Sequence, residues 1–139
     1  MAIGCSYRGA WFNGKKCGKG TITIDKNGYM IRSAFRDDML NGEGTRAYIT
    51  SKKELEGVWL NNELITGKMT LADGTTYEGD WVGGRPHGHG VKTIPGGKRY
   101  EGMFSRGRPW GMGTKIQGKV SENGYWEGLK FIIGEVSAE

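Results

Sequence analysis

Apolar and polar positions alternate along short stretches of this chain, most clearly in "YEGDW" at 77–81. Side chains of an extended strand point to opposite faces in turn, so Tyr77, Gly79 and Trp81 share one face while Glu78 and Asp80 share the other. The pattern therefore predicts a β-strand with an aromatic face and a polar face.

The same five-residue pattern occurs along most of the chain: "YRGAW" at 7–11, "IRSAF" at 31–35, "LEGVW" at 55–59 and "YEGMF" at 100–104. The closing aromatic residues are separated by 24, 24, 22 and 23 residues. In four copies a Gly-x-Gly follows seven residues later. The third copy has Ile65 and Gly67 there, as expected if its turn is one residue shorter. A fixed period of this length indicates a repeat architecture.

Each copy contains two turn signals, so each copy predicts a hairpin. Gly84 follows the first strand, as Gly14 and Gly107 do in their copies, and glycine readily adopts the backbone angles of a tight turn. On the return strand, Gly88 and Gly90 leave bare backbone on which a neighbouring ring can lie. A second turn, as in "DKNG" at 25–28, leads to the next copy. The prediction is an all-β, single-layer antiparallel meander, elongated to roughly 50 Å.

These residues resemble the MORN repeat family (membrane occupation and recognition nexus), whose pattern is an aromatic-x-Gly-x-aromatic strand, a short basic turn, Gly-x-Gly and a return strand. The resemblance covers residues 7–128. It implies one domain over 1–139, with Trp126 and Gly128 starting an unfinished copy that caps the C-terminal end. The expected repeats are 7–30, 31–54, 55–76, 77–99 and 100–125, with the cap at 126–139.

Composition and charge agree with a small folded domain. The chain has 26 Gly but only three Pro, and it is rich in aromatic residues, which argues against low-complexity disorder. No apolar run is long enough to cross a bilayer. Cys5 and Cys17 stand twelve residues apart without CxxC spacing, which favours two reduced thiols. We expect a cytoplasmic protein, peripheral at a membrane or the cytoskeleton only through a partner.

No pattern in the sequence carries catalytic chemistry. The stretch "GRPHGHG" lacks the GxxxxGK[ST] of a phosphate loop and follows a strand without opening a helix. His87 and His89 have no further ligand at a known metal spacing, and Asp37 and Asp38 lie beside a turn where solvation explains them. No nucleophile stands in a recognisable motif. We expect no enzyme activity, no metal and no cofactor.

The main functional prediction is a protein-interaction module, an adaptor, scaffold or inhibitor, because the chain is almost all repeat. A single-layer sheet has no second layer over its aromatic stripe, so part of the stripe is expected to form a groove for a peptide or helix. Most of the stripe is expected to be the core of the fold. The predicted groove residues are Tyr7, Trp11, Phe35, Trp59, Tyr77, Trp81, Tyr100 and Phe104.

A second predicted surface is the turn edge, where the repeat gathers the residues that follow each closing aromatic. Its apolar members suggest either partner contact or packing under a neighbouring turn. Its basic members, together with Lys19 and Arg106, support the alternative function, binding to anionic phospholipid headgroups. Aromatic residues committed to the sheet argue against nucleic acid, and open edge strands suggest a homodimer. The predicted turn-edge residues are Lys15, Lys16, Met39, Leu40, Leu64, Arg85, His87, Arg108 and Trp110.

Overall fold

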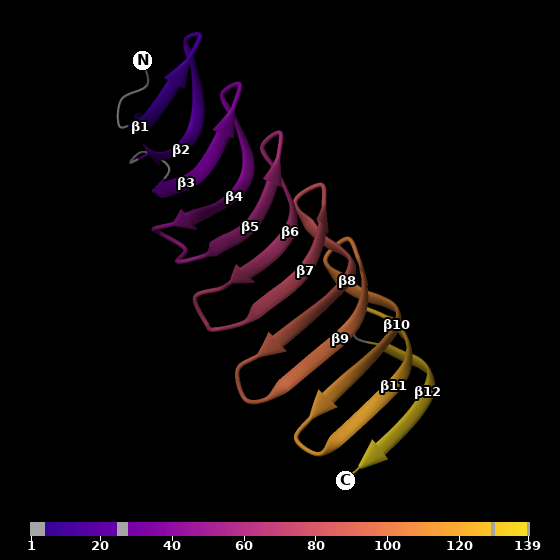
Figure 1. Ribbon diagram of the computed structural model, residues 1–139. Coiled ribbons are helices and arrows are strands. Elements are labelled where there is room, and N and C mark those ends of the chain that lie inside the picture. The colour runs from indigo at the N-terminus through magenta and orange to yellow at the C-terminus, as the bar shows by residue number, and fades with distance from the viewer. Residues whose placement is uncertain (1–4, 25–27, 129, 139) are drawn as a thin grey trace. The chain divides into compact units, whose positions relative to one another are not determined.

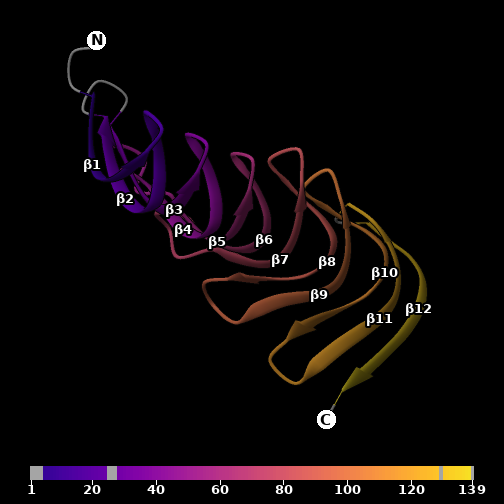
Figure 2. The same cartoon turned by 45° about the horizontal axis from the view of Figure 1, so that its top comes forward.

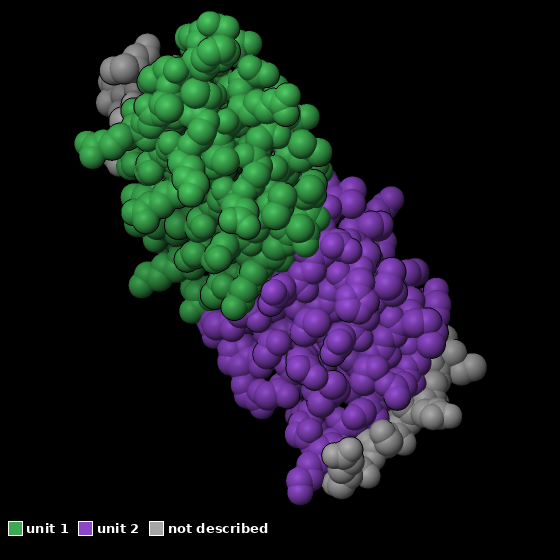
Figure 3. Space-filling view, in the orientation of Figure 1, with its two compact units in different colours: residues 1–72 green, residues 73–139 purple. Residues whose placement is uncertain are grey.

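The computed structural model describes residues 5–24, 28–128 and 130–138, and the chain divides into two compact units, residues 1–72 and 73–139 (Figure 3). All regular structure in the described residues is β-strand, so the all-β prediction is confirmed. The expected single domain and its elongated shape stay predictions. The turn expected at 25–28 lies largely outside the described residues.

Unit 1 is an antiparallel meander of six strands in chain order (Figure 1). Consecutive strands pair with one another, hairpin by hairpin, as the alternation of strand patterns and turn signals predicts. The strands are β1 (Cys5–Phe12), β2 (Lys15–Ile24), β3 (Tyr29–Arg36), β4 (Met39–Tyr48), β5 (Glu54–Leu60) and β6 (Glu63–Thr70).

Unit 2 repeats this arrangement with six further strands (Figure 2). Its pairings are again antiparallel between neighbours in the chain. The strands are β7 (Thr76–Val82), β8 (Arg85–Ile94), β9 (Lys98–Ser105), β10 (Arg108–Gln117), β11 (Val120–Glu127) and β12 (Lys130–Ala138).

The register of β11 corrects the predicted C-terminal cap. Lys115 of β10 pairs with Tyr100 on one side and with Glu122 on the other, so Glu122 holds the position of the first aromatic of a copy. Trp126 is therefore the closing aromatic of "ENGYW", not the first residue of a new copy. Strand β12 pairs along β11 and completes the hairpin, so the sixth copy is not unfinished.

The first Gly of each Gly-x-Gly makes a bulge rather than a socket. Gly18, Gly42, Gly88 and Gly111 have φ between 66° and 102°, and the pairing of their strands shifts register there. In the third copy Val58 pairs with Thr66 and Trp59 with Leu64, so only one residue is skipped. The predicted one-residue shortening is confirmed.

The second Gly of Gly-x-Gly is the socket for a ring in three of the four copies that have this motif, while Gly44 of the second copy lies against Ser33. The Tyr77 ring lies where a Cβ on Gly90 would stand, and the Tyr7 and Tyr100 rings lie over Gly20 and Gly113 in the same way. The prediction of ring-covered glycine is thus confirmed for Gly90. It is wrong for Gly88, whose nearest neighbour is the Asp80 side chain.

Polar atoms of the aromatic residues are paired with the backbone in a repeated manner. The Tyr77 hydroxyl donates to the Asp80 carbonyl at 2.8 Å, and the Tyr100 hydroxyl donates to the Met103 carbonyl at 2.9 Å. The Trp59 indole N–H donates to the Gly44 carbonyl of the preceding copy at 2.9 Å. Each ring therefore fills the core without leaving an unpaired polar atom.

In the second, third and fifth copies the first turn is bonded to the turn of the copy before it. Asp38, Asn62 and Gly107 occupy the second position of two-residue turns with φ of 66°, 71° and 86°, as type I′ hairpins require. Their backbone N–H groups donate to the carbonyls of Lys16, Leu40 and Pro86 respectively. These turn-to-turn bonds join hairpins that are about one repeat apart in the chain.

At four junctions the residue at this turn position matches the residue that it faces. Where the facing residue has a backbone N–H, a side-chain oxygen accepts it: Lys16 N–H donates to Asp38 Oδ1 at 2.7 Å, and Leu40 N–H donates to Asn62 Oδ1 at 2.8 Å. Where the facing residue is proline, which has no N–H, the turn residue is glycine. The two such pairs are Pro86 with Gly107 and Pro109 with Gly128.

Candidate functional site

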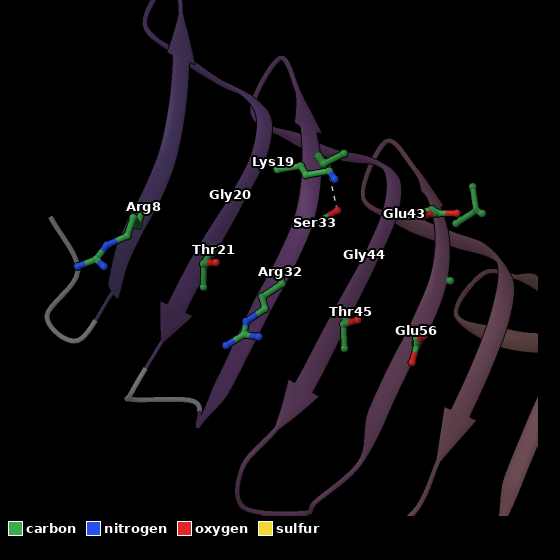
Figure 4. Close-up of a pocket in the computed structure, with 13 residues that line it drawn as sticks. Arg8, Lys19, Gly20, Thr21, Arg32, Ser33, Glu43, Gly44, Thr45 and Glu56 are labelled. Carbon is green, nitrogen blue, oxygen red and sulfur yellow. Dashed lines mark hydrogen bonds between the residues drawn. The ribbon is translucent and has the colours of Figure 1, made fainter.

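The candidate site is a hollow on the face of unit 1 that lies opposite the aromatic stripe. Its volume is about 660 Å³. Pairing of neighbouring strands places one side chain from each of β1 to β5 in a transverse row (Figure 4). The row consists of Arg8, Thr21, Arg32, Thr45 and Glu56.

A second row of the same face lies two residues nearer the first turns. It contains Lys19 and Glu43, separated by the short side chain of Ala34, and ends at Val58. Positive charge therefore gathers over β1–β3 and negative charge over β4 and β5. We call these the positive half and the negative half of the hollow.

The five charged side chains of the hollow are not satisfied within the described part of the chain. None of them makes a side-chain hydrogen bond or an ion pair there, whereas Lys16 pairs with Asp38 at 3.3 Å and Arg99 with Glu101 at 3.8 Å elsewhere. These five residues are Arg8, Lys19, Arg32, Glu43 and Glu56. As far as the described residues go, their charges are open to the groups of a partner.

The charge of the hollow results from a change of sign at two repeat positions, one of which is the middle residue of Gly-x-Gly, Lys19 in the first copy and Glu43 in the second. The second residue of the five-residue pattern is Arg8 and Arg32 in the first two copies but Glu56, Glu78 and Glu101 in the next three. Of these site residues, only Lys19 was among the residues predicted to bind. Comparing this position between copies would have found Arg8, Arg32 and Glu56, and comparing the middle residue of Gly-x-Gly would have found Glu43 beside Lys19.

The aromatic stripe is mostly core, as expected, and most of the residues named for the groove are buried. Six of the eight predicted groove residues are at most 7% exposed: Phe35, Trp59, Tyr77, Trp81, Tyr100 and Phe104. Their rings pack edge to face, as Tyr77 does on Phe104 at a centroid separation of 4.9 Å. Burial raises the pKa of Tyr77 to about 12, with the nearby Asp80 carboxylate acting in the same direction.

The accessible end of the stripe lies at the first copy. Tyr7 is half-buried and Trp11 is 57% exposed. The Lys16 ammonium lies 5.5 Å from the Tyr7 ring centroid and 5.7 Å from that of Trp11, within reach of a cation–π interaction. Only these two of the predicted groove residues keep a surface that a partner could contact.

The turn edge divides in the same way. Lys15, Met39, Arg85, His87, Arg108 and Trp110 are exposed, and Lys16 is half-buried. Leu40 and Leu64 are buried at 2% and 3% exposure, so placing them on a contact surface is wrong. Of the two explanations considered for apolar residues here, local packing rather than partner contact applies to these leucines.

A second hollow, of about 170 Å³, lies in unit 2 on the aromatic side. Tyr100, Pro109 and Trp126 line it together with Lys92 and Lys115, and the Lys115 ammonium lies 5.9 Å from the Trp126 ring. Its lining includes residues of the core, and its size suits a single side chain. It is smaller than the hollow of unit 1, and its charged lining residues, Lys92, Lys98, Arg99 and Lys115, are all basic.

The described residues contain no group of three or more His, Cys, Asp or Glu side chains that could hold a metal ion. His87 and His89 are exposed on β8, and Cys17 is a free thiol. The absence of catalysis, metal and cofactor remains a prediction. No helix among the described residues is long and apolar enough to span a membrane.

Comparison with known proteins adds a family. Four segments, residues 7–29, 33–50, 77–99 and 100–117, match the profile of the MORN repeat, and together they cover more than half of the chain. A search of curated proteins finds no match. The matched segments fall within the first, second, fourth and fifth copies, and the third copy, which has the shortened bulge, is not among them.

Proposed function

The chain belongs to the MORN repeat family, and from this premise we propose that it is a non-catalytic module that binds a segment of another protein. The MORN repeat is a non-catalytic module, and MORN repeats take part in protein–protein and in membrane or lipid interactions. The proposal assigns the chain to the first of these classes, as an adaptor, scaffold or inhibitor.

The observation that carries this proposal is the set of unsatisfied charges in the hollow of unit 1. Both signs of charge lie on one open face, and no group of the described chain neutralises them. Such a surface is hydrated when the protein is alone, and a partner with complementary charges can replace the water. The aromatic end at Tyr7 and Trp11 offers a smaller contact on the opposite face.

Affinity capture from an extract of the source cell tests the proposal with three variants. Arg8→Glu/Arg32→Glu reverses the positive half, Trp11→Ala removes the exposed ring, and Arg85→Glu/Arg108→Glu reverses the turn edge. Circular dichroism first establishes that each variant is folded. A protein partner lost only with the first variant supports the hollow, while loss only with Trp11→Ala assigns binding to the aromatic end. Recovery of no protein under any condition would refute the module.

The second candidate function is binding to anionic phospholipid headgroups through the turn edge. It is favoured by the exposure of Lys15, Arg85, Arg106 and Arg108 near the first turns. Each basic residue near a membrane surface contributes about 1 kcal/mol, so four could give measurable attachment at low salt. Sedimentation with phosphatidylserine vesicles tests it: binding should fall steeply with ionic strength and disappear in Arg85→Glu/Arg108→Glu.

A further inference from the structure

We propose that the hollow of unit 1 recognises an extended protein segment in which an acidic residue and a basic residue stand three or four positions apart. This inference rests on the proposed function and deepens it by naming the chemistry of the partner. It follows from the geometry of the two halves, from the absence of internal partners, and from the mixture of charge signs.

The positive half is built around Thr21. Arg8 and Arg32 lie directly across from Thr21 on the two neighbouring strands, so each is about 4.8 Å away in backbone spacing. Lys19 lies two residues along β2 on the same face. A carboxylate above Thr21 can accept hydrogen bonds from two guanidinium groups and one hydroxyl, and arginine favours this fork-like pairing.

The negative half is built around Thr45. Glu56 lies directly across from Thr45 on β5, and Glu43 lies two residues along β4 on the same face. Lys68 stands opposite Glu56 on β6 and marks the outer limit of the negative charge. A lysine or arginine of the partner can place its cationic group between the two carboxylates.

The spacing between the halves sets the spacing in the partner. Their centres, Thr21 and Thr45, lie two strands apart, which is roughly 10 Å. An extended chain advances about 3.3 Å per residue, so groups over the two centres stand about three residues apart, or four if the chain crosses obliquely. The partner segment therefore lies across the strands rather than beside an edge strand.

A protein segment fits this face better than a membrane or a nucleic acid does. Anionic bilayers and nucleic acid backbones present one sign of charge, which would face Arg8 and Arg32 favourably but would be repelled by Glu43 and Glu56. A polypeptide can present both signs in order. The mixture of charges in the hollow therefore weakens binding of ligands that carry one sign of charge and strengthens binding of a segment that carries both.

The equivalent face of unit 2 lacks this arrangement. Glu78 and Glu101 stand where the arginines stand in unit 1, Val91 replaces the central threonine, and Arg99 is already paired with Glu101. The repeat framework alone therefore does not produce the hollow's charge pattern. Unit 2 serves as an internal reference in the experiment, because its backbone amides should not respond to the ligand.

Two fluorescein-labelled peptides of identical composition test the inference. In the block peptide two aspartates are separated from two lysines by a Gly-Ser spacer, and in the mixed peptide aspartates and lysines alternate. Fluorescence anisotropy should give the block peptide a dissociation constant about tenfold lower. Arg8→Glu/Arg32→Glu should abolish that preference, and amide shifts of the unmodified protein should be confined to β1–β5.

The control variant Lys52→Glu/Lys119→Glu changes net charge by the same amount at exposed positions outside the hollow and should leave block binding unchanged. The inverted variant, with Glu43→Lys and Glu56→Lys added to the two arginine reversals, should regain binding because an extended peptide can lie in the opposite direction. Circular dichroism shows which variants fold, and the two arginine reversals alone suffice for the test.

Three results would overturn the inference: equal affinity for both peptides, equal loss in the control variant, or binding of phosphatidylserine vesicles that disappears with Arg8→Glu/Arg32→Glu. Capture of a protein partner that is lost with the hollow variant, together with equal peptide affinities, would refute the charge order and leave the proposed function standing. Preference for the block peptide without any captured protein would instead refute the proposed function alone.

Discussion

The match between Leu40 and Asn62 predicts that two substitutions, each harmful alone, compensate for one another. Leu40 N–H donates to Asn62 Oδ1 at 2.8 Å beside a leucine that is only 2% exposed. Asn62→Gly leaves that donor unpaired, which costs about 1–3 kcal/mol. The same change also removes the backbone strain of a non-glycine residue at φ 71°, which should raise the free energy of unfolding by about 1 kcal/mol. The net loss in the free energy of unfolding should be about 1 kcal/mol.

In the Leu40→Pro background residue 40 has no N–H to be left unpaired. There the same Asn62→Gly change should raise the free energy of unfolding by about 1 kcal/mol. The two effects of one substitution thus differ by about 2 kcal/mol, which is the coupling energy of the pair. Pro86 with Gly107 shows that the resulting combination already occurs in this fold.

Urea unfolding of the four proteins, the parent, both single variants and the double variant, measures the coupling through the midpoint and slope of each transition. The reciprocal variant Gly107→Asn is the control: its new side chain faces Pro86, which has no N–H, so it should only lose about 1 kcal/mol from its positive φ. Identical effects of Asn62→Gly in the two backgrounds would refute the matched-pair explanation.

Three further predictions concern the turn and the core. The Lys16 N–H lowers the pKa of Asp38 in the folded protein. The Asp38 carboxylate therefore stabilises the fold above about pH 4, and this contribution is lost as pH falls through the lowered pKa of the folded state. In Asp38→Asn the urea midpoint of unfolding should change less with pH over that range. Tyr77, with a raised pKa of about 12, stabilises the fold below about pH 10 and loses that contribution as pH rises toward 12; Tyr77→Phe should make the phenolate-linked step of alkaline unfolding disappear. Gly90→Ala should lower the free energy of unfolding by about 3 kcal/mol or more because its methyl group would meet the Tyr77 ring. Gly14→Ala, with open space around it and φ 75°, should lose only about 1 kcal/mol by thermal melting, and equal losses for the two glycines would contradict the socket.

The fold was predictable because its determinants are local and repeated. The alternation of Tyr77, Gly79 and Trp81 predicts a strand with one aromatic face, and the two-residue turn predicts the hairpin. The repeat period predicts which strands pair. The sixth copy was misread because Glu122 stands where an aromatic residue was expected. Only the pairing of Lys115 with Glu122 reveals the frame.

The candidate site was less predictable because burial depends on contacts between copies. Leu40 and Leu64 look like exposed turn residues in sequence, yet both are buried in unit 1. The sequence pattern predicted partner binding on the aromatic stripe, while Arg8 and Arg32 resembled ordinary residues of the polar face. Their significance becomes visible only when the paired strands bring them to either side of Thr21.

Matching of each turn to the one before it also limits how such a chain can grow by gene duplication. Tandem duplication of the fifth copy would place Gly107 after Pro109, a compatible junction of the kind already found between Pro109 and Gly128. Moving that copy to follow the second would instead place a glycine opposite Leu40, whose N–H would have no acceptor. At these junctions the copies are therefore not freely interchangeable, because a turn glycine suits a facing proline and a turn asparagine or aspartate suits a facing backbone N–H.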